Sequence, residues 1–197
     1  MALTTAQKQA LKAAIDANPT WAAYPQNSDG YADLATALNQ PANPAFSVWR
    51  TDVPVSPIMD AITWANYTPN DVVGGSDTDP LLSRKIGWLL TVQTKQMNLQ
   101  LMLQGRDRLN CSPPNVRAGL RDAVIQVPTG AGGALTSPGG ASGATVLNVC
   151  TRNATEGEKV LAAASQGSDT TGTVTARVLG FEGNLSGADV QAARELP

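Results

Sequence analysis

Apolar residues recur at helical spacing along much of the chain, and this pattern predicts a mainly α-helical fold. The clearest helix is predicted from Asp79-Pro80 to about Gln104, with Gly105 placed to end it. Its apolar residues fall within about 120° of one another at 100° per residue; they are Leu82, Ile86, Leu89, Leu90, Met97 and Leu101. We therefore predict that this stripe faces inward and that the segment is the central helix of a bundle.

Shorter helices are predicted on both sides of this segment. Thr4 and Gln7 have the spacing of a capping box, which predicts a helix over residues 5–17. Periodic apolar residues bounded by proline, serine or glycine predict further helices over residues 30–39, from Pro57, over 115–127 and over 144–165. Together these segments predict one domain, residues 1–165, with a helical bundle as its core.

Two stretches depart from the helical pattern. Residues 128–143 are rich in glycine, and we expect a mobile loop there. Beyond a linker at 166–172, alternation over 173–181 predicts a short strand, and Ser186 and Asp189 predict a short helix over 187–195. Since a helical bundle offers no strand to pair with, we predict that residues 166–197 are a docking arm that adds a strand to another subunit. The predicted partner-binding residues are Val174, Val178, Leu179, Phe181, Leu185 and Val190.

The composition favours association with other proteins. Charged residues make up 15% of the 197 residues, against a typical fraction of about 25%, and the net charge is −2. A surface with so few charges is poorly protected against association, which favours a subunit of an oligomer. No run of Lys or Arg indicates sequence-specific nucleic-acid binding, and no stretch approaches the ~20 apolar residues of a membrane span. The first residues lack the pattern of a signal peptide, so we expect no export.

The sequence offers no constellation for catalysis or metal binding. It contains no histidine, the commonest general base and metal ligand. Cys111 and Cys150 are the only cysteines, too few for a zinc site from one chain without histidine. Asp71, Asp77 and Asp79 share a loop but do not match a calcium-binding loop, and we assign them to turns and a helix cap. We therefore expect no enzyme activity, no catalytic residues, no cofactor and no metal.

Several segments resemble virion proteins of tailed bacteriophages and prophages. The resemblance rests on TTAQKQALK (4–12), PAFSVWRT (44–51), VRAGL (116–120), CTRNATEGEK (150–159) and FEGNLSGADVQAAR (181–194). The order of these features resembles head–tail adaptor (connector) proteins, which are small helical bundles with a C-terminal arm. The glycine-rich loop has no counterpart in that pattern.

This resemblance implies a structural protein of the phage neck. It implies a homo-oligomeric ring, with a dodecamer as one stoichiometry, that binds the portal protein on one side and a downstream tail protein on the other. Such a protein is located in the virion and is assembled in the host bacterial cytoplasm. Two alternatives stay open: a tail terminator, tail completion or capsid-decorating protein, and a small helical ligand-binding protein. We expect a terminator to contain a sheet, which the predicted elements lack.

Overall fold

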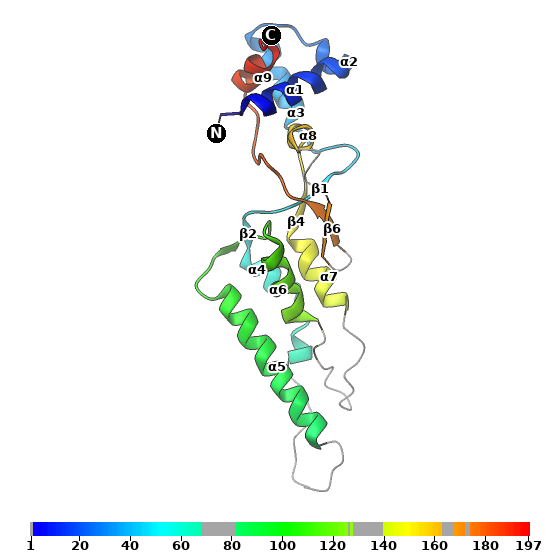
Figure 1. Ribbon diagram of the computed structural model, residues 1–197, viewed down its shortest axis with the longest axis vertical. Helices are drawn as coiled ribbons and strands as arrows, with labels where there is room; N and C mark the ends of the chain where they lie inside the picture. The colour runs from blue at the N-terminus through cyan, green and yellow to red at the C-terminus, as the bar shows by residue number, and fades with distance from the viewer. Residues whose placement is uncertain (1, 68–81, 126, 128–139, 163–167, 172–173) are drawn as a thin grey trace. The chain divides into compact units, whose positions relative to one another are not determined.

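The computed structural model describes residues 2–67, 82–125, 127, 140–162, 168–171 and 174–197 (Figure 1). These residues pack into two compact units. Unit 1 consists of Met1–Val48, Arg152–Ser168 and Ala176–Pro197, and unit 2 consists of Trp49–Thr151 and Asp169–Thr175. Each unit thus combines segments that are distant in the sequence. The predicted division into a core, 1–165, and a docking arm, 166–197, concerns partner binding and stays a prediction.

Unit 1 is built from short helices with strong capping signals. They are α1 (Thr5–Ala17), α2 (Pro19–Ala22), α3 (Ser28–Leu38), α8 (Glu156–Leu161) and α9 (Gly187–Arg194). The capping boxes expected from Thr4 and Ser186 are both present, each closed by the side chain three residues later. The predicted helices at 5–17 and 187–195 are confirmed to within a residue. The helix predicted at 30–39 begins earlier, because Asn27 accepts a hydrogen bond from the Gly30 amide and caps it.

The core of unit 1 forms where α9 packs on α1 and α3, as Figure 1 shows. Fully buried side chains from all three helices meet there, among them Leu11, Ile15, Leu34, Leu38 and Val190. Asn39 fastens the segment before α9, because its side-chain amide donates to Leu185 O at 2.9 Å and its Oδ1 accepts from Leu185 N at 2.8 Å. The C-terminal residues are therefore integral to this core.

A glycine in α8 is explained by the same packing. By itself Gly157 would weaken the helix, because glycine costs about 1 kcal/mol relative to alanine. A Cβ at this position would lie 2.6 Å from Leu185 Cδ1. The small residue lets the C-terminal segment approach α8 closely, so the local cost is offset by tertiary packing.

Unit 1 also contains a buried ion pair centred on Glu158. Its carboxylate accepts two hydrogen bonds from Arg152, at 2.7 and 2.8 Å, and further ones from the backbone amides of Thr155 and Gly183. Burial alone would raise the pKa of Glu158, but these donors outweigh it and hold the pKa below its ordinary value. Arg152 reaches a second carboxylate, Glu182, at 3.0 Å. The network ties α8 to the chain that leads into α9.

Unit 2 contains the longest helix. Its helices are α4 (Val55–Asp60), the 3-10 helix η1 (Trp64–Tyr67), α5 (Leu82–Leu103), α6 (Pro114–Val124) and α7 (Gly140–Val149). Strand β2 (Val53–Pro54) pairs antiparallel with β3 (Arg108–Leu109). α6 packs against both α5 and α7, and α4 packs against α7. α5 confirms the helix predicted at 80–104, and α6 confirms the helix predicted at 115–127.

The prediction of a simple helical bundle is wrong, because the described residues also form a sheet. Four described strands form it in the order β4 (Thr151–Asn153), β1 (Ser47–Trp49), β6 (Val174–Arg177) and β5 (Ser168–Thr171). β6 is the strand that we expected to lack an intrachain partner. It runs parallel to β1, with Val48 opposite Arg177. The fold is thus mixed, with helices in both units and a sheet whose strands come from four parts of the chain.

The sheet also explains why two local predictions are wrong. The single helix expected over 144–165 is divided into α7, β4 and α8, because Thr155 caps a new helix and residues 151–153 enter the sheet. The linker expected over 166–172 contains β5. Apolar periodicity does not register such a break when the inserted residues are few. Of the glycine-rich loop expected over 128–143, residues 128–139 lie outside the described part of the chain, and residues 140–143 belong to α7.

The Glu158 network gives a stability prediction. Glu158→Gln is expected to lower the free energy of unfolding by about 3 kcal/mol, because it removes one partner of a buried ion pair. Glu182→Gln, the matched control, leaves the Arg152–Glu158 pair in place and should cost less than about 1 kcal/mol. Urea unfolding measures both values, and equal losses would contradict this account.

The Glu158 carboxylate also makes the free energy of unfolding depend on pH in the acid range. Since the pKa of Glu158 is lowered in the folded chain, its contribution is present above the ordinary glutamate pKa of about 4.3 and is lost as pH falls through the lower folded value. We expect the free energy of unfolding to fall over this range in the wild-type chain. The Gln variant should show a smaller fall, and an unchanged pH profile would contradict the assignment.

Candidate functional site: an apolar ridge on α5

Helix α5 carries apolar residues on two opposite faces. Val92, Leu99 and Leu103 are buried and form the inner face. Ile86, Leu90, Met97 and Leu101 lie within about 60° of one another, centred about 150° away from the inner face at 100° per residue. We call these four residues the ridge.

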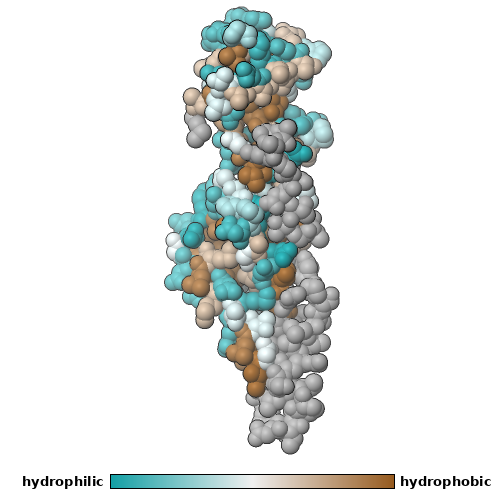
Figure 2. Space-filling model, in the orientation of Figure 1, coloured by the Kyte–Doolittle hydropathy of each residue, from teal (hydrophilic) through white to brown (hydrophobic). Residues whose placement is uncertain are grey.

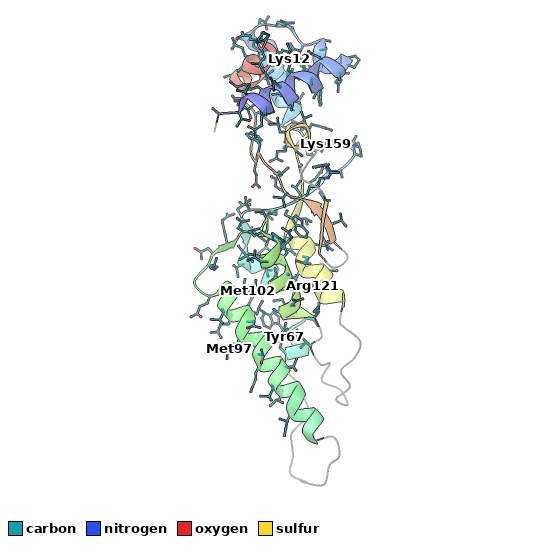
Figure 3. The ribbon with its side chains drawn as sticks, viewed as in Figure 1. Lys12, Tyr67, Met97, Met102, Arg121 and Lys159 are labelled. Atoms are coloured by element: carbon teal, nitrogen blue, oxygen red, sulfur yellow. The ribbon has the colours of Figure 1, made fainter. Side chains whose placement is uncertain are left out.

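The ridge is exposed to solvent. The exposed fractions are 45% for Ile86, 58% for Leu90, 61% for Met97 and 66% for Leu101. Hydrophobic surface is visible along α5 in Figure 2, and Met97 projects from the helix on the side away from Tyr67 in Figure 3. Contiguous exposed apolar side chains of this kind commonly mark a protein-binding surface.

The prediction that the apolar stripe of this helix faces inward is therefore wrong. Four of its six residues make up the exposed ridge, Leu89 is half-buried, and the side chain of Leu82 lies outside the described part of the structure. The buried side chains Val92, Leu99 and Leu103 were missed, although they recur at spacings of seven and four. The spacing of apolar residues identifies an apolar face of a helix. Where a helix has two such faces, the spacing does not show which of them is buried. The signal that could have shown the ridge was the presence of two stripes on one helix.

Polar contacts hold the inner side of α5 against its neighbours. Gln96 donates to Tyr67 O at 3.2 Å, and the buried Tyr67 hydroxyl donates to Ala123 O of α6 at 2.6 Å. Lys95 Nζ donates to the carbonyl oxygen of Asp122, also in α6. Burial lowers the pKa of Lys95, although the Asp122 carboxylate opposes that shift. The bonds of Lys95 and Gln96 favour the rotation of α5 in which Val92, Leu99 and Leu103 are buried.

Grooves run along α5 on both sides of the ridge. One of about 730 Å³ lies between α5 and α6, and its lining includes Leu90 and Leu101 of the ridge and Gly119 and Ala123 of α6. The other, of about 480 Å³, is lined by α4, η1 and α5, including Met59 and Trp64. Trp64 is also exposed, at 43%. The ridge thus stands beside recesses of a size that can receive side chains of another protein.

The residues predicted to bind partners lie elsewhere. Phe181, Leu185 and Val190 are brought together in the core of unit 1, where they are buried. Val174 is buried in β6, and Val178 and Leu179 are half-buried. Partner binding by these six residues stays a prediction, but four of them have little surface to offer while the chain keeps this fold.

Both cysteines are buried in unit 2 beside a buried arginine. The Arg117 guanidinium lies 4.5 Å from the centre of the Trp49 ring and donates to Cys111 O at 2.9 Å. The hydrogen bond with Cys111 and burial both raise the pKa of the Cys150 thiol. Neither thiol is exposed to solvent, so this cluster belongs to the packing of unit 2.

Within the described ranges, no group of three or more His, Cys, Asp or Glu side chains is placed to hold a metal ion. Asp71, Asp77 and Asp79, which we assigned to turns and a cap, lie outside those ranges. Among the helices in the described part of the chain, none has the length and apolar character needed to cross a membrane.

Comparison with protein-family models, with curated proteins and with solved structures finds no match. The functional argument therefore rests on the residues themselves.

The buried hydroxyl of Tyr67 gives a test of how η1 is held against α6. Burial raises the pKa of Tyr67 to about 12 from an ordinary value of 10.0. A folded-state pKa above the unfolded one means that the contribution to stability is intact below pH ~10 and is lost as pH rises toward ~12. Titration followed by phenolate absorbance should show a late phase near pH 12. Tyr67→Phe should remove that phase and lower the free energy of unfolding by about 1–2 kcal/mol, by leaving Ala123 O without its donor. Tyr24→Phe is the control, and loss of the late phase in that variant would contradict the assignment.

Proposed function

We propose that this protein is a structural subunit of a tailed-phage particle and that it acts as a head–tail adaptor between portal and tail. The observation that carries the proposal is the ridge, an uncharged apolar face on a helix whose opposite face is already buried. A helix with two apolar faces needs two partners, and its own unit supplies one. The sequence resemblance supports the placement in the phage neck, and the low charge content supports a subunit that buries much of its surface.

The energetics of the ridge fit a role in assembly. Fully burying a Leu, Ile or Met side chain stabilises by about 1.5–3 kcal/mol. Since the four ridge side chains are about half exposed, covering them contributes about 1 kcal/mol each. This gain supports reversible subunit contact, and a particle gains stability by repeating it in many subunits. We accordingly propose that the protein has no enzymatic turnover.

A tail terminator or tail completion protein is the second candidate, and the sheet favours it. We had separated the two roles by the absence of a sheet, and the order β4-β1-β6-β5 removes that distinction. Both candidates bind protein subunits. Co-expression with the portal protein and, separately, with tail proteins of the same genome distinguishes them.

The ligand-binding alternative gains little from the groove between α5 and α6. Its volume, about 730 Å³, lies in the range of small-molecule pockets. Its charged groups, however, bind each other or neighbouring residues. Lys95 donates to the Asp122 carbonyl, and the Asp122 carboxylate pairs with Arg121 at 2.8 Å. A pocket needs polar groups turned toward a ligand, and these are engaged within the protein.

Particle incorporation tests the proposal. Leu101→Lys is expected to reduce entry of the protein into portal-containing complexes at least tenfold, because it places a charge in an apolar contact. Leu101→Met keeps the side chain apolar and should be incorporated like the wild type. Circular dichroism should be unchanged in both variants, since Leu101 is exposed. Normal incorporation of the Lys variant would contradict a role for the ridge, and a wild-type chain that joins neither portal nor tail would contradict the proposed function.

A further inference from the structure

The spacing of the ridge is symmetric. Its four residues are separated by four, seven and four positions, a series that reads the same from either end of the helix. A two-fold axis between Gln93 and Thr94 therefore places Ile86 opposite Leu101 of a second copy. The same axis places Leu90 opposite Met97 of that copy. Both pairs are satisfied at once only when the two helices run antiparallel.

We propose that the ridge is covered by a second copy of this chain, with the two α5 helices packed antiparallel about this axis. The inference rests on the proposed function only in taking the ridge to be a protein contact. It goes further by naming the occupant, the direction of the helices and the residue pairs. A surface that matches itself in this way is the requirement for an isologous two-fold interface.

The charges around the ridge permit this contact. Among the residues of α5 whose side chains the structure describes, Lys95 is the one that carries a charge. Its Nζ donates to Asp122 O in α6, so the ammonium group is engaged within its own chain. The exposed neighbours Gln93 and Thr94 are neutral. Within these described residues of α5, the pairing of two copies brings no like charges together, which would otherwise oppose a symmetric contact.

The geometry is suited to close packing. From Ile86 to Leu101 the ridge is about 22 Å long at 1.5 Å per residue. Spacings of four and seven keep the side chains on one seam, as in paired helices that interlock. The groove beside the ridge, with Gly119 and Ala123 in its lining, leaves room for side chains of the second copy. Helices that pack in this way lie 8–10 Å apart.

An interface with two-fold symmetry closes on itself and forms a pair. A ring of subunits is built by head-to-tail contacts between different surfaces. If the protein forms a ring, the subunits of the ring therefore need a second, different contact. The α5 contact would then join two subunits of one ring, or one subunit from each of two rings. The inference thus predicts a dimer as the basic unit of the isolated protein.

Disulfide trapping tests the pairing directly. Chains with Leu90→Cys and chains with Met97→Cys are mixed and oxidised at a concentration at which sedimentation shows association. Antiparallel packing sets residue 90 of one chain opposite residue 97 of the other, so the mixture should give dimers joined between these two positions. Each variant alone should give at least tenfold fewer dimers, because identical positions are then about 10 Å apart along the helix axis. The native cysteines are buried and do not compete.

Each other outcome overturns the inference. Dimers formed efficiently by either variant alone would indicate parallel helices. The absence of links in every mixture, with the wild-type chain sedimenting as a monomer, would show that the ridge is covered by another part of the same chain or by a different protein. Met97→Leu is the control for association and should preserve the dimer, whereas Met97→Lys should weaken dimerisation at least tenfold with unchanged circular dichroism.

The result separates the two proposals. Mixed 90–97 links in a protein that binds neither portal nor tail support the pairing and contradict the proposed function. Incorporation into portal complexes without such links supports the function and contradicts the pairing.

Discussion

The constraint on which the account depends is the rotation of α5 about its own axis. The helix has apolar side chains on opposite faces, and only one face can pack against the unit that carries it. In the structure Val92, Leu99 and Leu103 lie inside, and the hydrogen bonds of Lys95 and Gln96 to neighbouring backbone oxygens favour this rotation. The ridge is left outside by the same contacts. An exposed apolar surface is thus a consequence of how α5 packs in unit 2.

Unit 1 follows a different principle, in which distant segments of the chain are joined by buried polar groups. Glu158 receives hydrogen bonds from Arg152, Thr155 and Gly183, so one carboxylate holds α8 and the chain that leads to α9. Asn39 and Arg194 add side-chain bonds to backbone oxygens at the other end of this packing. The C-terminal helix then completes an apolar core that α1 and α3 cannot close alone. Apolar side chains therefore remain uncovered on α5, whereas Val190 and Leu185 are buried.

Local signals in the sequence predicted the helices well and their packing poorly. Thr4 with Gln7, and Ser186 with Asp189, mark helix starts because each pair satisfies backbone amides within a few residues. The sheet could not be foreseen, since residues 47–49 and 174–177 pair across more than half the chain and carry too few residues to show alternation. The ridge residues were identified as apolar, but their direction depends on contacts with distant segments, such as the bond from Gln96 to Tyr67 O. Gly157 is unfavourable in a helix when only the local sequence is considered, and the reason for it lies in Leu185, which is distant in the sequence.

The direction of α5 can be measured most directly by comparing two leucines on its opposite faces. Leu99→Ala and Leu90→Ala remove the same atoms from the same helix, and equilibrium unfolding is followed at a concentration at which the chain is monomeric. The structure predicts a loss of about 2–5 kcal/mol for Leu99→Ala, since that side chain is buried. It predicts a loss within about 0.5 kcal/mol for Leu90→Ala, since that side chain is largely exposed. Equal losses, or a larger loss at Leu90, would mean that the ridge is covered within its own chain and would contradict the account.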